Sequence, residues 1–300
     1  MKERVHFGTW DSAGSEARFR AMEDELWDER GDRPEALAVD TRWGTTCGYR
    51  WPGDGEPVLF LHGTAGTSAS WVPYIPTLGG RDAYAFDTIG DVGRTRQTVE
   101  IRESADLAGW LDQSLAGLGL DRVHVVGVSY GGFLGLTLAT HHPERVRSLA
   151  LLDPGGIVPL RLFRFLAWGT AVMLASRLPG RPRRAAARAL RMPVLDDPRV
   201  MRAVFFAQRH HRVRLLPTDP LSDEQLGAID VPVLVLAGDR SEVNDARALV
   251  ARAEALIPGA ETELIPGAGH ALVLSHLDHC AARLRDFQRR ADQRSKRMAP

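Results

Sequence analysis

Ser129 is the residue whose surroundings most clearly suggest chemistry. It lies in the segment HVVGVSYGGF, residues 124–133, directly after an apolar run and between two glycines. A strand ending at Val128 and a helix beginning near Gly131 would place Ser129 on a tight turn, with its hydroxyl exposed at a helix N-terminus. Gly-x-Ser-x-Gly between a strand and a helix predicts an activated nucleophile. The alternative is a tight turn whose hydroxyl does no chemistry.

His270 is the candidate general base. It lies in the segment IPGAGHALVL, residues 265–274, and is the one histidine of ten that is expected on a glycine-rich turn at the end of a strand. Its position after Ser129 and after every candidate acid fits the chain order Ser, acid, His. The other histidines are interpreted as surface or packing residues.

A second glycine-containing segment, FLHGTAGTSASW at residues 60–71, is expected to help bind a developing negative charge. It follows another apolar run, so its backbone can turn toward the serine. We predict an oxyanion hole formed by the backbone N–H groups of Thr64 and Tyr130. His62, in the same segment, is expected to hydrogen-bond its own loop.

Short apolar runs alternate with helical segments along most of the chain. Runs such as PVLFLHG (57–63) and VPVLVLAGD (231–239) are continuous, which is typical of strands buried on both faces. We therefore predict an α/β fold with a mostly parallel central sheet of about eight strands flanked by helices. The expected parts are an N-terminal helical arm at 1–35, a core at 36–154 and 228–290, a helical insertion without strands at 155–227, and a disordered tail at 291–300.

From about residue 36 to residue 290 the chain resembles enzymes of the α/β-hydrolase fold. The resemblance rests on His62–Gly63, on the turn from Gly127 to Gly132, on Gly269–His270 and on the loop FDTIGDVGRTRQT at 86–98. It implies a serine hydrolase with a helical cap inserted after the sixth strand, above the serine. Fold membership alone does not define the substrate.

The acid that this resemblance implies is missing from its usual place. In most of the family it follows the seventh strand, three residues after the glycine that ends it; here that glycine is Gly238 and the third residue is Ser241. Asp153, at the end of the sixth strand, is the preferred substitute, because some members carry their acid there. The acid must accept the Nδ1–H of the histidine, so geometry decides which carboxylate serves. The other candidates are Glu242, Asp239 and, less favoured, Asp245; the absence of any acid also stays open.

The composition is that of a soluble globular protein. The 300 residues are 44% hydrophobic and 25% charged with a formal net charge of zero, so nothing suggests a nucleic-acid partner. Cys47 and Cys280 are expected to be buried free thiols in a reducing cytoplasm. No secretory signal is apparent, and the uncharged stretch from Phe165 to Ser176 is shorter than the roughly 20 residues that span a bilayer. We predict a cytoplasmic protein with no cofactor, metal or transmembrane segment.

The predicted cap is rich in arginine. Between Arg161 and Arg214 there are 13 arginines and two acidic residues, a net charge of +11. The default interpretation is a solvated outer face; the alternatives are contacts with the acidic N-terminal helix at 13–30, with an acidic carrier protein, or with an anionic lipid surface. Apolar residues of the cap are candidates for lining a pocket. These are Trp168, Phe165 and Met173, together with Phe163, Leu174, Phe205 and Phe206.

Three functions are compatible with these residues. The one we expect is a hydrolase that cleaves an ester, thioester or lactone of a small apolar substrate through an acyl-enzyme on Ser129. The second is an acyltransferase or cyclase, which resolves the same acyl-enzyme with a hydroxyl or amine. The third is a non-catalytic pocket protein on the same scaffold, suggested by the missing acid at Ser241.

Overall fold

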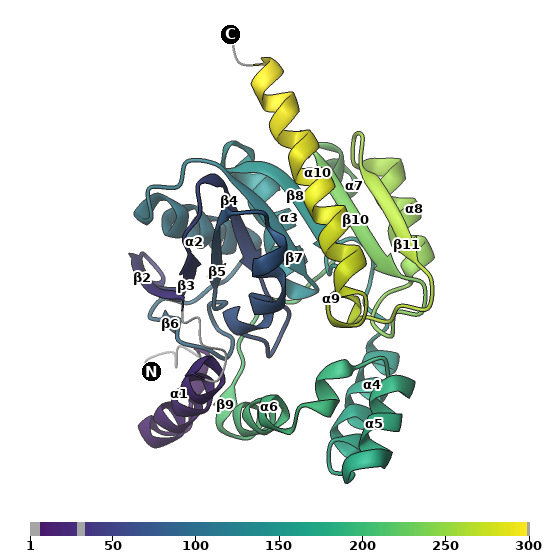
Figure 1. The fold of residues 1–300 in the computed structure, drawn as a ribbon. Helices are drawn as coiled ribbons and strands as arrows, with labels where there is room; N and C mark the ends of the chain where they lie inside the picture. The colour runs from purple at the N-terminus through teal and green to yellow at the C-terminus, as the bar shows by residue number, and fades with distance from the viewer. Residues whose placement is uncertain (1–6, 29–33, 299–300) are drawn as a thin grey trace.

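A nine-stranded mixed sheet forms the centre of the molecule (Figure 1). In the computed structural model, which describes residues 7–28 and 34–298, the strand order is β11-β10-β8-β7-β4-β5-β3-β2, and the short β6 pairs with β3. This confirms the predicted α/β class. The strands are β2 (Glu35–Thr41), β3 (Gly44–Trp51), β4 (Gly55–Leu61), β5 (Arg81–Phe86), β6 (Arg96–Gln97), β7 (Val123–Val128), β8 (Val146–Leu152), β10 (Val233–Gly238) and β11 (Glu261–Ile265).

The register of the parallel strands brings three strand ends together. Strands β5, β4, β7, β8, β10 and β11 run parallel, whereas β2 and β3 form an antiparallel hairpin at one edge. Val128 of β7 and Leu236 of β10 both pair with Leu152 of β8. The residues that follow these strands therefore meet at one edge of the sheet, where α/β folds place their ligands.

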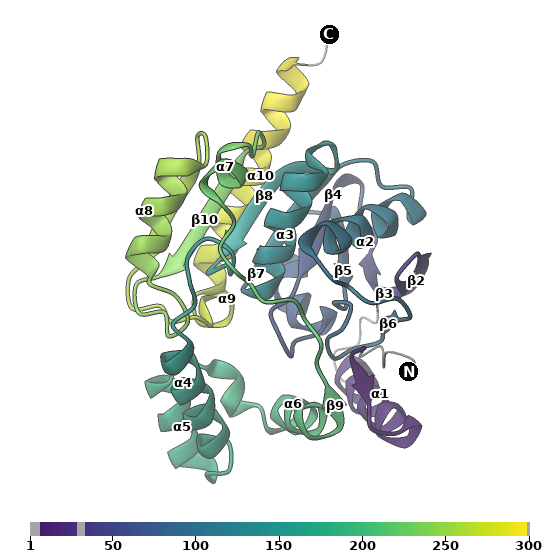
Figure 2. The same cartoon turned by 180° about the vertical axis from the view of Figure 1, so that it is seen from behind.

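Both faces of the sheet are buried, which explains the continuous apolar runs. In β4, Leu59 and Leu61 pack into one hydrophobic cluster, and Val58 and Phe60 pack into a second cluster on the other face. Figures 1 and 2 show the covering helices from the two sides. One face carries α2 (Ser104–Gly117), α3 (Tyr130–His141), α7 (Asp223–Gly227) and α8 (Ala246–Leu256); the other carries the 3-10 helix η1 (Ser68–Thr77) and α10 (Leu277–Met298), with α9 (Leu272–Ser275) preceding α10.

Between β8 and β10 the chain leaves the sheet and forms a helical segment at the carboxyl ends of the strands. In Figure 1 its helices lie at the end of the molecule opposite the C-terminus. Val172, Ala175, Ala187, Leu195 and Met201 give this segment a small apolar core of its own. The helices are α4 (Leu162–Ala175), α5 (Gly180–Ala189), η3 (Pro193–Asp196) and α6 (Pro198–His210).

The acidic helix α1 (Ala13–Asp28) packs against α6. Phe19 and Met22 share a cluster with alanines of α6, and Arg202 forms an ion pair with Glu25 at 2.9 Å. The short strand β1 (Thr9–Trp10) pairs with β9 (His211–Arg212) beside this contact. The suggested contact between the N-terminal helix and the arginine-rich segment is therefore present at α6.

Two expectations about the chain's organisation are wrong. The tail predicted to be disordered over 291–300 is helical up to Met298. Asp292 ties α10 to the sheet through an ion pair with Arg81 at 2.5 Å and a hydrogen bond with His124 at 2.9 Å. The insertion at 155–227, expected to lack strands, contains β9, whose partner β1 lies at the other end of the chain.

Parts of the predicted organisation lie outside the described residues. These are residues 1–6 and 29–33 of the arm and residues 299–300 of the tail. Both cysteines are free, but only Cys280 is buried, whereas Cys47 is half-buried. Within the part of the chain that the structure describes, no helix is both long enough and apolar enough to span a bilayer.

The turn between β7 and α3 has room only for glycine at two positions. A Cβ atom on Gly131 would lie 2.0 Å from the carbonyl oxygen of Leu61, and one on Gly127 would lie 2.2 Å from that of Gly131. Both obstacles are backbone atoms of the packed sheet and turn, so they cannot move aside without disturbing the strands.

We expect Gly131→Ala to lower the free energy of unfolding by at least about 2 kcal/mol, because the added methyl group collides with strand β4. Urea denaturation followed by circular dichroism measures this change. Gly180→Ala is the matched control, since a Cβ atom there has nothing within 4 Å, and it should change the stability by less than about 0.5 kcal/mol. Equal stability of the two variants would contradict the steric account of the turn.

Candidate active site

Ser129 occupies the turn between β7 and α3 with a strained backbone. Its φ of 53° and ψ of −116° lie in a region that L-amino acids rarely adopt. The backbone is held from both sides, because the Ser129 N–H donates to Leu152 O at 3.2 Å and the Ser129 carbonyl accepts from the N–H groups of Gly132 and Gly155 at 3.0 and 2.9 Å. The residue is therefore fixed at the edge of the sheet.

The structure brings His270 and Asp153 together. His270 Nδ1 lies 2.5 Å from Asp153 Oδ2, and the Asp153 side chain is fully buried while that of His270 is 13% exposed. Because Nδ1 faces the carboxylate, Nε2 is the ring nitrogen left to exchange protons with a substrate or nucleophile. Among the described residues no hydrogen bond joins Ser129 Oγ to His270, although both line one cavity. Such bonds often tighten only when substrate binds.

Ser241 contacts the acid rather than replacing it. Its hydroxyl donates to Asp153 Oδ2 at 2.6 Å and accepts from the backbone N–H groups of Val243 and Asn244 at 3.2 and 3.1 Å. Our sequence analysis treated Ser241 only as a missing acid. A small hydroxyl residue at that position, together with an aspartate at the end of β8, is the signal that could have indicated this pair.

The other three candidate carboxylates have different partners. Glu242 accepts the backbone N–H of His270 at 3.0 Å and forms an ion pair with Arg191 at 3.2 Å. Asp239 accepts from the N–H of Gly267 at 2.7 Å. Asp245 caps the N-terminus of α8. Glu242 therefore supports the backbone of the histidine loop, and none of the three is recorded within hydrogen-bond distance of the His270 ring.

The loop after β4 presents the two N–H groups predicted to form the oxyanion hole. Thr64 and Tyr130 both line the cavity beside Ser129, and within the described residues no hydrogen bond uses either N–H. His62 is structural, as expected: its Nδ1 lies 2.8 Å from Gly63 O, and its Nε2 accepts from the N–H of Thr88 at 3.0 Å.

Two buried aspartates that the sequence analysis did not single out hold this loop. Asp91 accepts from the N–H of Ala65 at 2.9 Å, and Asp87 accepts from the N–H and hydroxyl of Ser68 at 2.8 and 2.7 Å. Burial raises the pKa of Asp91 above its ordinary value. Both aspartates lie in the segment FDTIGDVGRTRQT, so their positions in a loop beside the serine were the available signal.

A cavity of about 500 Å³ opens above Ser129, between the sheet and the helical segment. Of the predicted lining residues, Trp168, Phe165, Met173 and Phe205 line it, and the ring of Trp168 stands perpendicular to that of His270 with centroids 6.3 Å apart. The rest of the wall is mainly apolar. It includes Val128, Leu160, Val172, Met192, Val194, Val200, Met201, Val204, Val243, Val273 and Leu274.

Three predicted lining residues lie elsewhere. Phe163 is 88% exposed and Leu174 is 58% exposed, because both point away from the cavity on the outer face of α4. Phe206 packs against Trp10 with ring centroids 6.5 Å apart. Helical periodicity places Phe163 and Leu174 on one face of α4 and Phe165 and Trp168 on the other. Without a structure, either face could have been the inner one.

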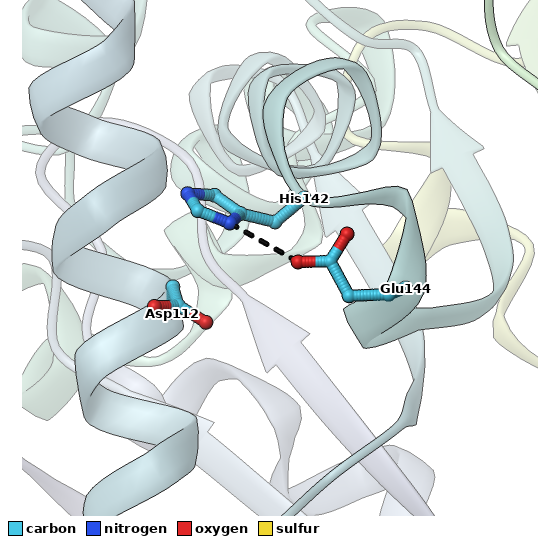
Figure 3. A group of neighbouring side chains, drawn as sticks. All are labelled: Asp112, His142 and Glu144. Atoms are coloured by element: carbon cyan, nitrogen blue, oxygen red, sulfur yellow. Dashed lines mark hydrogen bonds and ion pairs between the residues drawn. The ribbon is translucent and has the colours of Figure 1, made fainter.

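One group of side chains away from the cavity has the composition of a metal site. Figure 3 shows Asp112, His142 and Glu144, whose candidate ligand atoms all lie within 4.8 Å of one another. Asp112 already accepts from Arg145 at 2.6 Å, and His142 lies 3.3 Å from Glu144. These ion pairs account for the group, and we assign no metal to it.

Comparison with known proteins identifies the family of the chain. Residues 58–286 match the alpha/beta hydrolase family. The chain belongs to this family. The match covers the strands from β4 onward, the serine turn and the histidine loop of this α/β hydrolase.

Two relatives and one solved structure illustrate the range of similar proteins. Carboxylesterase YbfK of Bacillus subtilis is 28% identical over 267 residues, which cover 84% of this chain and 87% of the relative. The 2-hydroxymuconate semialdehyde hydrolase of Pseudomonas putida is 28% identical over 269 residues, which cover 82% of this chain and 93% of the relative. The crystal structure of naproxen esterase (carboxylesterase NP) from Bacillus subtilis superposes with a TM-score of 0.79 at 24% identity, covering 92% of this chain and 99% of that one, and shows the shared fold.

We expect Asp153→Asn to lower kcat for an activated ester by about 10⁴-fold, because an amide cannot hold the histidine tautomer as a carboxylate does. Glu242→Gln and Asp239→Asn should cost less than about tenfold, since these side chains bond backbone N–H groups. Steady-state kinetics of the three purified variants measures the difference. A larger loss in Glu242→Gln than in Asp153→Asn would move the acid to Glu242.

Proposed function

We propose that this α/β hydrolase is a serine esterase that cleaves neutral, apolar esters through an acyl-enzyme on Ser129. The observation that carries the proposal is a single cavity lined by Ser129 and His270, with Asp153 buried 2.5 Å behind the imidazole. The relatives support a broader assignment, namely a hydrolase of ester or carbon–carbon bonds. Thioesters and lactones would pass through the same acyl chemistry.

In the first half of the reaction, Ser129 Oγ attacks the carbonyl carbon while His270 Nε2 takes the hydroxyl proton. The carbonyl π electrons move to the oxygen, which the N–H groups of Thr64 and Tyr130 stabilise. The buried carboxylate of Asp153 accepts the Nδ1–H and stabilises the imidazolium. The tetrahedral intermediate then collapses, the bond to the alkoxy oxygen breaks, and His270 returns the proton to the leaving alcohol.

In the second half, water resolves the acyl-enzyme. His270 Nε2 takes a proton from a water molecule as its oxygen attacks the acyl carbon. The bond to Ser129 Oγ breaks, the proton returns to the serine, and the carboxylic acid leaves. An alcohol or amine acceptor in place of water would make the acyltransferase that the sequence analysis considered. Among the described residues that line the cavity there is no Arg, Lys, Asp or Glu to bind such an acceptor.

The cavity lining favours a neutral ester over the substrate class of the carbon–carbon hydrolase relative. A 2-hydroxymuconate semialdehyde carries a carboxylate, and a buried charge is costly unless an opposite charge pairs with it. None of the described residues that line the cavity is Arg, Lys, Asp or Glu. His270, the one titratable side chain with nitrogen donors there, is engaged by Asp153.

Removal of the nucleophile tests the proposal. We expect Ser129→Ala to lower kcat for p-nitrophenyl butyrate by at least about 10⁴-fold with an unchanged circular dichroism spectrum, because the acyl-enzyme cannot form without the Ser129 hydroxyl. Ser104→Ala, at the start of α2 and away from the cavity, is the control and should retain activity.

Three results would overturn the proposal. Retained turnover in Ser129→Ala would exclude the acyl-enzyme. Faster turnover of a carboxylate-bearing dienol ketone than of the butyrate ester by the unmodified enzyme would favour carbon–carbon hydrolysis. Ester product formation only in the presence of an added alcohol would favour acyl transfer.

A further inference from the structure

Helix α4 exposes an apolar face that has no partner in the described part of the chain. Leu162, Phe163, Leu166 and Leu174 are 55%, 88%, 54% and 58% exposed, and Leu178 just beyond the helix is 40% exposed. Phe163, Leu166 and Leu174 recur at helical spacing, so they share one side of the helix. A contiguous apolar surface of this kind normally marks an interaction site.

The opposite side of α4 is already used. Phe165, Trp168 and Val172 face inward and line the cavity above Ser129. The helix is therefore apolar on two faces. The cavity and the small apolar core of the helical segment cover only the inner face. Packing among the residues that the structure describes does not explain the outer face.

The outer face belongs to a strongly cationic segment. Residues 161–190, which span α4 and α5, contain seven arginines and no acidic residue. Arg161 pairs with Asp245, but no ion pair joins the other six to any residue that the structure describes. These six are Arg164, Arg177, Arg181, Arg183, Arg184 and Arg188. On α6, by contrast, Arg202 is paired with Glu25 of α1.

We propose that the α4–α5 hairpin, residues 161–190, docks on an anionic lipid surface. A helix that lies in a membrane interface buries an apolar face among the acyl chains while cationic side chains at its border reach phosphate groups. Phe163, Leu166 and Leu174 supply the apolar face, and the unpaired arginines supply the cations. Guanidinium groups suit phosphate because they bind it in a bidentate geometry. The 14 residues of α4 are too few to cross the bilayer, so the helix lies on it.

Docking in this orientation would place the cavity at the membrane. Met173 is 38% exposed and also lines the cavity, so the outer face and the cavity wall meet at this residue. Figure 1 shows α4 and α5 at one end of the molecule, where the sheet does not obstruct a flat surface. This consequence rests on the proposed esterase function: apolar esters dissolved in the bilayer would enter the cavity from its membrane side, past α4.

Vesicle co-sedimentation tests docking independently of catalysis when it is done with the full-length Ser129→Ala variant. The probes are vesicles of phosphatidylcholine alone and vesicles that also contain phosphatidylglycerol. We expect at least about tenfold tighter binding to the anionic vesicles, and weaker binding at high salt, because several arginines interact with the lipid phosphates.

Two sets of variants divide the contributions. The combined change of Phe163, Leu166 and Leu174 to serine should reduce binding to anionic vesicles by at least about tenfold. The combined change of Arg181, Arg184 and Arg188 to glutamine should abolish the preference for phosphatidylglycerol. There are two matched controls. One changes Val213, which is 38% exposed, to serine, and the other changes the exposed Arg102, Arg247 and Arg289 to glutamine. Both should bind vesicles as Ser129→Ala does.

Two kinds of result would overturn docking, and a third would overturn only its link to the proposed function. Equal binding to both vesicle types, or no binding, would exclude an anionic lipid surface. A dimer in size-exclusion chromatography that is lost in the serine variant would assign the face to a second copy of this chain. If anionic vesicles bind the protein but do not stimulate ester hydrolysis by the unmodified enzyme, docking stands and only its link to the proposed function is lost.

Discussion

Ser129 adopts a backbone conformation, φ 53° and ψ −116°, that an L-amino acid seldom occupies. Such a conformation costs on the order of 1–3 kcal/mol and persists only where the surrounding structure imposes it. Here the end of β8 binds the serine N–H, and the first turn of α3 and Gly155 bind its carbonyl. The parallel register of β7 and β8 thus fixes the hydroxyl at the sheet edge, and every other feature of the site is placed relative to it.

The same register explains how the acid can lie on a different strand from the usual one. Because Leu152, the last residue of β8, pairs with Leu236 near the end of β10, an aspartate after β8 and a residue after β10 can both lie near His270. Asp153 supplies one negative charge, and Ser241 supplies a hydroxyl that donates to it. Two carboxylates in these positions would repel each other and raise one pKa. A serine after β10 is therefore the compatible partner for an aspartate after β8.

Much of the fold was predictable because its signals are local. Continuous apolar runs indicated strands buried on both faces, and Gly127, Ser129 and Gly131 indicated the tight turn, whose steric need the structure confirms. The features that were missed depend on distant partners. Strand β9 exists because β1 pairs with it, and the end of α10 is ordered because Asp292 contacts Arg81 and His124.

The site shows the same division between local and distant signals. Sequence could nominate Ser129, His270 and four acids, but only the register of β8 with β10 brings Asp153 to the imidazole. The inner and outer faces of α4 were likewise indistinguishable, because both are apolar and the charge around them is uniformly positive. Their assignment depends on how the helix sits above the sheet.

Covalent labelling with a fluorophosphonate probe, followed by peptide mass spectrometry, tests the central claim most directly. Phosphonylation requires an exposed serine oxygen that a neighbouring imidazole can deprotonate at neutral pH. The account predicts one phosphonyl group per chain, attached to the peptide that contains Ser129. An unlabelled protein, or a label confined to another serine, would contradict it.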